Sequence, residues 1–408
     1  MRRQTQVVKN VGNSHLRCAP VFLHRFVFLV ATALLIVACS AQPKGSTGGA
    51  DHDDVGAGPT GEQLRGDDGS MTPDGADADS DDDEVPSDNG QAAAGEADGD
   101  SDDDEVPTDR APWSVEKADE NANEGGFAIL GDSDSDEYRA DDNRGGDYAS
   151  VTLNWMEQLV VARGLDFGKW GTWGGPRRTG FEYNWARSGA RAADLVGQGQ
   201  AAGVAQQIEN GAVKYVYVHI GANDFHLRNG TYDEIYDGTL TDSEVAVKVA
   251  KVVRDITSAV DIVLAANPER IVVTLKGDPD LSLRVRAKYP DVAGRNRASK
   301  AIALVNEGLT RMAATRSQVT VYDLNEFAAS LLDRVDATGN IEVGDELISL
   351  MEPGDEPHHA QLGDRSGHLG TVVSGLFANA TFIGPFNQAE QLGIPMLTDA
   401  EILSHAGM

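Results

Sequence analysis

The sequence predicts an α/β fold in which a mostly parallel sheet is covered by helices on both faces. From Phe127 onward, short apolar segments alternate in regular order with longer segments whose apolar residues recur every three or four positions. The apolar segments 214–220 and 270–275 are rich in Val and Ile, as strands buried on both faces are. Regular alternation of strands and helices is typical of such a sheet.

The expected elements follow one another along residues 127–324. Five apolar segments predict strands, and the amphipathic segments between them predict four helices. The expected strands are 127–130, 183–186, 214–220, 270–275 and 319–324, and the expected helices are about 149–163, 198–210, 242–266 and 293–315. Ligands of parallel sheets bind at the carboxyl ends of the strands, so the residues that follow each strand are the candidates for chemistry.

Residues 1–39 have the pattern of an export signal. They carry five Arg and Lys residues and no acid, and the segment 26–38 is apolar except for Thr32. An apolar core of this length is too short to span a membrane comfortably, which favours a signal sequence. The segment ends in Ile36-Val37-Ala38-Cys39, which resembles the lipobox of bacterial lipoproteins. The resemblance implies a lipid on Cys39 and a cell-envelope lipoprotein, periplasmic or cell-surface; an uncleaved anchor and a chance cysteine are the alternatives.

The acidic segment 40–126 predicts a disordered tether. It holds 26 Asp and Glu residues against 4 Lys and Arg, a net charge of −22. Few aliphatic clusters interrupt it, so it cannot bury enough apolar surface to offset its chain entropy. Loose binding of calcium to its aspartates is an alternative role. Residues 127–408 retain a net charge of −14, which argues against a nucleic-acid partner because phosphate would be repelled.

Chemically useful residues follow the predicted strands. Gly131-Asp132-Ser133 follows the first strand and presents a serine hydroxyl. Gly189 follows the second strand, and Asn223 follows the third, where its amide can donate to a developing oxyanion. Beyond the last strand, Asp364 precedes His368 by four residues, ahead of a helical pattern. Together these positions offer a nucleophile, hydrogen-bond donors, and a base with an acid to orient it.

In these motifs the chain resembles the SGNH hydrolases, the GDSL esterase and lipase family, over roughly residues 127–390, with 391–408 as a C-terminal segment. The resemblance implies a three-layer α/β/α sandwich around a mostly parallel five-stranded sheet, a flavodoxin-like arrangement. It implies Ser133 as nucleophile, His368 as general base and Asp364 as the acid that orients it. It also implies an oxyanion hole made by the backbone N–H groups of Ser133 and Gly189 and the side chain of Asn223.

Two positions depart from the family pattern. Asp134 stands where the family usually has a leucine, which makes the site more polar and disfavours long-chain lipids as substrates. The family's acid normally precedes its histidine by three residues, whereas Asp364 is four residues before His368. Asp355 and His358 have the usual spacing, so this earlier pair, or Asp355 serving His368, is an alternative.

No cofactor and no metal are expected. His358 and His359 are adjacent and point apart unless the turn is special, and no well-spaced third ligand is evident. Calcium binding is an alternative reading of one aspartate cluster near the nucleophile, although a solvated acidic loop fits better. This cluster comprises Asp132, Asp134, Asp136, Asp141 and Asp142.

The chain is therefore expected to be a serine esterase that removes small acyl groups through an acyl-enzyme intermediate, with a carbohydrate as a candidate alcohol. The substrate is a small-molecule or glycan ester. The alternatives are a surface glycan-binding protein that kept the fold without activity, and a lysophospholipase or thioesterase. An aromatic and basic segment suits either sugar binding or packing: Trp170, Trp173, Tyr183, Trp185, Arg177, Arg178 and Arg187.

Overall fold

The computed structural model describes residues 125–226, 231–364 and 367–408. The predicted signal sequence with Cys39, and the acidic segment apart from its last two residues, lie outside this part. No helix in the described ranges combines the length and the apolar character needed to cross a membrane.

A parallel sheet of four strands lies at the centre of the described residues. The strands pair in the order β1-β4-β5-β6, and every neighbouring pair is parallel. The predicted α/β fold is therefore confirmed, and four of the five expected strands are found within a few residues of their predicted positions. They are β1 (Gly126–Gly131), β4 (Val213–His219), β5 (Arg270–Thr274) and β6 (Val319–Tyr322).

The fifth expected strand, 183–186, does not form a regular strand. Its backbone runs beside β1, because Ile129 N–H donates to Tyr183 O at 3.1 Å and Trp185 N–H donates to Ile129 O at 3.0 Å. Only one ladder pair forms, between Ile129 and Asn184. Asn184 Oδ1 accepts from Ala186 N–H, and this local side-chain bond competes with a regular ladder. The five-stranded sheet is thus corrected to four regular strands with an irregular segment at the β1 edge.

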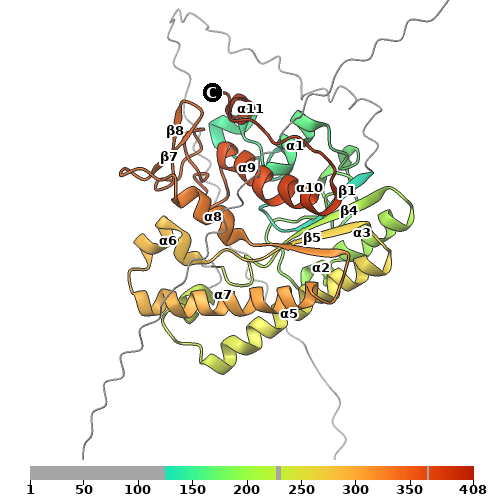
Figure 1. The fold of residues 1–408 in the computed structure, drawn as a ribbon, viewed down its shortest axis with the longest axis horizontal. Helices are drawn as coiled ribbons and strands as arrows, with labels where there is room; N and C mark the ends of the chain where they lie inside the picture. The colour runs from blue at the N-terminus through green and yellow to red at the C-terminus, as the bar shows by residue number, and fades with distance from the viewer. Residues whose placement is uncertain (1–124, 227–230, 365–366) are drawn as a thin grey trace, which may run out of the picture. The chain divides into compact units, whose positions relative to one another are not determined.

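Helices cover both faces of the sheet (Figure 1). One core cluster packs α3 (Gln200–Glu209), α5 (Asp242–Ala265) and α7 (Val292–Ala313) against one set of strand side chains, including Val216 and Val218. A second cluster packs α1, α9 and α10 against the alternate strand residues, because successive side chains of a strand point to opposite faces. The helices of the second cluster are α1 (Trp155–Arg163), α9 (Thr371–Phe377) and α10 (Gly384–Glu390).

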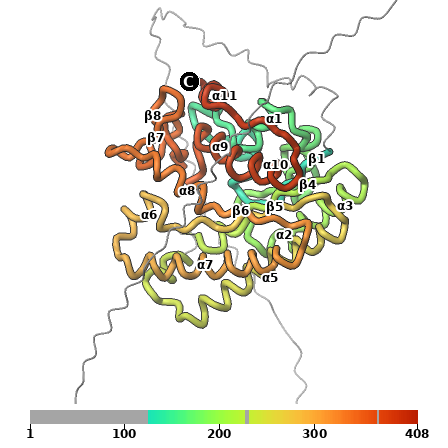
Figure 2. Tube along the Cα trace, viewed as in Figure 1, coloured from blue at the N-terminus to red at the C-terminus, as the bar shows by residue number. Residues whose placement is uncertain are grey.

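Shorter elements complete the fold, and Figure 2 follows the chain through them. Two antiparallel hairpins stand apart from the central sheet, and their strands are β2 (Trp170–Thr172) with β3 (Thr179–Phe181) and β7 (Asn340–Val343) with β8 (Glu346–Ser349). The remaining elements are η1 (Gly146–Val151), α2 (Asp194–Gly197), α4 (Thr231–Tyr236), η3 (Pro279–Leu281), α6 (Leu283–Lys288), α8 (Leu324–Leu332), η4 (Ala378–Ile383) and α11 (Asp399–His405).

The C-terminal segment 391–408 packs into the second core cluster. Leu397 and Ile402 are buried there together with residues of α1 and α9. Arg163, at the end of α1, donates to Glu401 through Nη1 at 2.8 Å and to Pro395 O through Nε at 2.8 Å. The segment is therefore a packed part of the same core.

Glu157 joins the start of α1 to the loop that follows β1. Its carboxylate accepts from Asn154 N–H at 2.8 Å, which forms a capping box, and from Arg139 N–H at 3.1 Å. The side chain is fully buried, and this burial raises the pKa of Glu157 to about 7.

We expect the buried Glu157 to make unfolding depend on pH. Between the ordinary glutamate pKa and about 7 the unfolded chain loses this proton while the folded chain keeps it, so the free energy of unfolding falls as pH rises. The free energy of unfolding should fall by about 2 kcal/mol less between pH 5 and pH 8 when Glu157 is replaced by glutamine. Urea unfolding of both proteins at the two pH values measures this difference, with the exposed Glu209→Gln as control. An equal fall of the unfolding free energy in wild type and E157Q would contradict this prediction.

Candidate active site

Ser133 lies in a tight turn directly after β1. The Asp132 carbonyl accepts from the N–H groups of Ser135 at 3.1 Å and Asp136 at 3.0 Å. Asp132 Oδ1 also accepts from Asp134 N–H at 3.2 Å, so the buried Asp132 braces the turn. Gly131 is required by close packing, because a Cβ there would lie 2.9 Å from His219 O. The turn therefore holds the Ser133 hydroxyl at the carboxyl end of the sheet.

His368 contacts the Ser133 hydroxyl. Its Nε2 lies 2.7 Å from Ser133 Oγ, and its Nδ1 forms a short hydrogen bond with Asp364 Oδ2. The imidazole is buried, and Tyr138 packs edge-on against it with ring centroids 6.2 Å apart. A histidine in this position can take a proton from the serine while the carboxylate stabilises the resulting imidazolium.

Asp364 contacts His368 despite the four-residue spacing between them. Gly367 N–H donates to Asp364 Oδ1 at 3.0 Å, and the other carboxylate oxygen, Oδ2, bonds to the imidazole. Asp355 instead accepts from Gly363 N–H at 2.9 Å. His358 is exposed and lies 3.4 Å from Glu346 Oε2. In the described ranges, Asp364 and not Asp355 is thus the carboxylate in contact with His368.

The two other predicted oxyanion donors lie on neighbouring loops that are bonded together. Gly189 is exposed and has a φ of 82°, a conformation that favours glycine. Asn223 Nδ2 donates to Ala190 O at 2.9 Å, which links its loop to the Gly189 turn. Asp224 Oδ2 accepts from Ala192 N–H at 2.9 Å and strengthens the same link. The loops after the second and third predicted strands are therefore held in one arrangement.

A residue that sequence reasoning missed, Arg144, lies at the centre of the site. Its Nη1 donates to Asp364 Oδ2 at 2.8 Å and lies 2.6 Å from His368 Nδ1. Its Nη2 donates to Asp142 Oδ2 at 2.7 Å and to Ser188 Oγ at 3.1 Å. No motif surrounds Arg144 in the sequence, so only the spatial contacts reveal it.

Asp134, which replaces the family's usual leucine, is half-buried beside the buried His219 and Lys276. Its Oδ2 lies 3.5 Å from His219 Nε2. Lys276 is buried beside this pair and donates through Nζ to the Ile220 carbonyl. Burial lowers the pKa of Lys276 to about 8, although the carboxylates of Asp132 and Asp134 raise it. The positive charge of Lys276 thus partly offsets the negative charge of the two carboxylates that flank Ser133.

The aspartate cluster considered for calcium is divided among different partners. Asp136 Oδ2 accepts from Ser188 N–H at 2.7 Å, and Asp141 Oδ2 accepts from Thr179 N–H at 3.1 Å. Asp142 binds Arg144. Asp132 and Asp134 do approach His219, with one ligand atom from each residue within 4.8 Å of the others. Lys276 lies close enough for its charge to attract both carboxylates.

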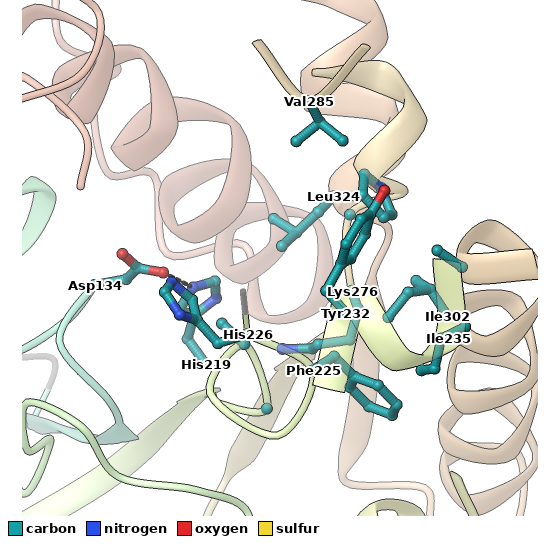
Figure 3. Close-up of a pocket in the computed structure, with 15 residues that line it drawn as sticks. Asp134, His219, Phe225, His226, Tyr232, Ile235, Lys276, Val285, Ile302 and Leu324 are labelled. Carbon is teal, nitrogen blue, oxygen red and sulfur yellow. Dashed lines mark ion pairs between the residues drawn. The ribbon is translucent and has the colours of Figure 1, made fainter. Parts of the chain in front are cut away.

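A mostly apolar cavity of about 250 Å³ opens beside Asp134. Figure 3 shows Asp134 and His219 at one end of it, with Ile235 and Ile302 at the other end. The walls come from the Asn223 loop, the segment after β5, α4 and α7. His368 is not among the lining residues. Ser133 is not among them either, so the cavity adjoins the turn that carries Ser133 through the next residue, Asp134.

The aromatic and basic segment is largely occupied by its own packing. The Arg177 guanidinium lies 4.7 Å from the ring centroid of Trp173 and 4.2 Å from that of Trp185. Arg178 lies 3.6 Å from Asp136 and 3.7 Å from Asp142. Trp170 is 44% exposed, so it is the member of the segment best placed to meet a ligand.

Comparisons with known proteins place this site in a family context. Residues 127–352 match the model of the GDSL-like lipase/acylhydrolase family. A search of curated proteins finds no match to this sequence.

Similar solved structures include an extracellular lipase from Streptomyces rimosus, with 16% identity, a TM-score of 0.36, and coverage of 65% of this chain and 99% of that one. Another is the acetylxylan esterase Axe2 from Geobacillus stearothermophilus, with 14% identity, a TM-score of 0.36, and coverage of 67% and 96%. A third is a carbohydrate esterase family 3 protein from Talaromyces cellulolyticus, with 15% identity, a TM-score of 0.34, and coverage of 65% and 99%.

Proposed function

Because the chain belongs to the GDSL-like lipase/acylhydrolase family and is a carboxylic ester hydrolase, we propose that it is a serine esterase acting through an acyl-enzyme on Ser133. One observation carries the proposal: His368 Nε2 lies 2.7 Å from Ser133 Oγ while its Nδ1 bonds to Asp364. This arrangement supplies a nucleophile, a base within hydrogen-bond reach and a group that orients the base.

The proposed reaction proceeds in two halves. His368 removes the Ser133 proton as Oγ attacks the ester carbonyl, and then delivers that proton to the departing alcohol oxygen. A water molecule, activated by the same imidazole, cleaves the acyl-enzyme and regenerates the serine. Asp364 stabilises the imidazolium that forms in each half.

The tetrahedral intermediates carry negative charge on the former carbonyl oxygen. We assign the backbone N–H groups of Ser133 and Gly189 and the side chain of Asn223 as the donors that stabilise it. The bond between Asn223 Nδ2 and Ala190 O supports this assignment, because it holds the Asn223 and Gly189 loops together before substrate arrives. Donors held in place in this way need little reorganisation during the reaction.

The base and the cavity suggest where the two parts of the ester would bind. The leaving alcohol has to lie near His368 to receive its proton, and we propose that the acyl group points the other way, into the cavity that opens beside Asp134. A cavity of about 250 Å³ accommodates roughly ten non-hydrogen atoms, judged against engineered cavities of about 150 Å³ that hold benzene. We therefore propose small acyl groups of up to roughly eight carbons.

The alcohol side is polar. Asp142, Ser188 and Asp364 all bond to Arg144, which itself contacts His368. Such a surface suits an alcohol with many hydroxyl groups, so we propose a carbohydrate ester as the substrate class. The exposed Trp170 offers an aromatic face of the kind that packs on sugar rings.

Filling the cavity should change the acyl preference. With 4-nitrophenyl esters, we expect kcat/KM to rise from acetyl to hexanoyl and to fall at dodecanoyl. Replacing Ala298, a buried lining residue of α7, by leucine should lower kcat/KM for the octanoyl ester by about 10- to 100-fold and leave the acetyl ester within about twofold. Steady-state kinetics across the ester series measures both effects.

The matched control is Ala303→Leu, which makes the same substitution at an exposed position of α7 and should leave the series unchanged. A dodecanoyl maximum in the wild type would instead support a lysophospholipase. Absence of turnover for every ester, and for acetylated glycans, would support the inactive glycan-binding alternative. Equal effects of A298L on acetyl and octanoyl esters would contradict the acyl assignment.

We further propose that the enzyme works in the cell envelope, tethered to a membrane by a lipid on Cys39. The support comes from the basic and apolar residues 1–38 and the motif that ends in Cys39. Metabolic labelling with a fatty-acid analogue, compared between wild type and Cys39→Ala, tests the anchor directly.

A further inference from the structure

We propose that Arg144 is a positioning residue that holds the Asp364–His368 pair and the Ser188–Gly189 turn in one arrangement. This inference rests on the proposed function, because Arg144 would serve the same acyl-transfer reaction. Arg144 acts on the reaction through these neighbours and not by direct contact with Ser133.

One set of bonds joins Arg144 to the acid, Asp364. Asp364 is 30% exposed, so its carboxylate lacks the packing that usually locks a side chain. Hydrogen bonds supply this restraint instead: Gly367 N–H holds Oδ1, while Arg144 Nη1 and His368 Nδ1 share Oδ2. A charge-assisted bond from a guanidinium fixes both the place and the orientation of a carboxylate. Arg144 thereby supports an acid that stands one residue away from the usual spacing.

A second set of bonds joins Arg144 to the turn that carries Gly189. Arg144 Nη2 donates to Ser188 Oγ at 3.1 Å and to Asp142 Oδ2 at 2.7 Å. Ser188 Oγ donates to the same Asp142 oxygen, and Ser188 N–H donates to Asp136 Oδ2 at 2.7 Å. These bonds hold the residue directly before Gly189, whose N–H is a proposed oxyanion donor.

Arg144 itself is held firmly enough to position other groups. Its side chain is 12% exposed, and its guanidinium lies 5.4 Å from the ring centroid of Tyr138. Arg144 N–H donates to Tyr138 O at 2.9 Å, so backbone and side chain both rest on this tyrosine. Tyr138 is buried and also packs against His368. The histidine and the arginine therefore share one rigid support.

The shape of the guanidinium explains why an arginine occupies this position. One nitrogen faces the Asp364–His368 pair and the other faces Asp142 and Ser188, so the planar group spans two partners in fixed directions. A lysine ammonium is a compact charge on a flexible stem and cannot hold both directions at once. Lysine should therefore replace Arg144 only in part.

The test compares Arg144→Gln, Arg144→Lys and wild type with 4-nitrophenyl butyrate. We expect R144Q to lower kcat by about 100-fold with KM within about twofold, because small misplacements of reacting groups cost rates of this order. The rate of labelling by a fluorophosphonate probe should fall by the same factor. R144K should retain an intermediate rate, and guanidinium ion at a non-denaturing concentration should partly restore Arg144→Ala.

Arg163→Gln is the matched structural control. Arg163 is 11% exposed and, like Arg144, binds a carboxylate and other partners, but it ties the C-terminal segment to α1. R163Q should lower the melting temperature and leave kcat and the labelling rate of the folded protein unchanged. The assignment would be overturned if folded R144Q had the kcat of wild type. It would also be overturned if R144Q lost activity only because part of the protein was unfolded, as expected for R163Q. Ser133→Ala, measured in parallel, separates the two proposals: if S133A retained turnover the proposed function itself would fail.

Discussion

Replacing Ser133 by alanine should reduce turnover of 4-nitrophenyl butyrate by about 10⁴-fold or more, because no other group can form the acyl-enzyme. The hydroxyl removed is the one that lies 2.7 Å from His368 Nε2. Binding and oxyanion contacts would remain, so a small residual rate above the uncatalysed reaction is expected. Steady-state kinetics on the folded variant, checked by its melting temperature, measures the loss. A fluorophosphonate probe should label the wild type on Ser133 and should not label S133A.

Ser135→Ala provides a control within the same turn. Ser135 is fully buried, and its hydroxyl has no hydrogen-bond partner in the part of the chain that the structure describes. Its removal should leave kcat within about threefold of wild type, as expected for a side chain outside the reaction. If S133A kept a tenth of the wild-type rate, or if the probe labelled it, Ser133 would not be the nucleophile.

Replacing His368 by glutamine should lower kcat by about 10⁴-fold at neutral pH, because the variant loses the base whose Nε2 contacts Ser133 Oγ. A glutamine side chain can still hydrogen-bond to Ser133 but does not accept its proton at this pH. Labelling by the fluorophosphonate probe should slow by a similar factor, since it also depends on an activated serine. The ratio of labelling rates in H368Q and wild type tests the assignment independently of the ester used.

His358→Gln distinguishes the two histidines that the sequence left open. His358 is exposed and lies near Glu346, the first residue of β8. H358Q should have wild-type kcat if His368 is the base. A large loss in H358Q together with an active H368Q would instead favour the earlier pair of Asp355 and His358.

The parts of the fold that the sequence predicts well are those with local causes. The strands around Ile129 and Val216 and the helices α3, α5 and α7 follow from apolar periodicity within each segment, and they are found near their expected positions. The irregularity of segment 183–186 could not be predicted in this way, because it arises from a hydrogen bond between Ala186 N–H and the Asn184 side chain. Apolar content alone does not reveal such a local competitor of the sheet ladder.

In the candidate site, too, some residues could be predicted from local sequence and others could not. Turn chemistry and the position after a strand single out Ser133, Gly189 and Asn223, and the order of motifs supplies the resemblance to the family. The sequence favoured Asp364 but left Asp355 as an alternative, since both lie a few residues before a histidine. It also could not explain Asp134, whose contact with His219 becomes visible only when β1 and β4 are neighbours.

By itself, the sequence determined the fold class, the Gly-Asp-Ser turn and the residue types that an esterase needs, because periodicity and turn preferences act over a few residues. Only the tertiary structure decided which acid contacts His368, that Arg144 joins this acid to the Ser188 turn, and that a cavity opens beside Asp134. The physical reason is distance along the chain. Arg144 and Asp364 are separated by 220 positions, and Ser133 and His368 by 235, so their contacts depend on how the whole domain packs.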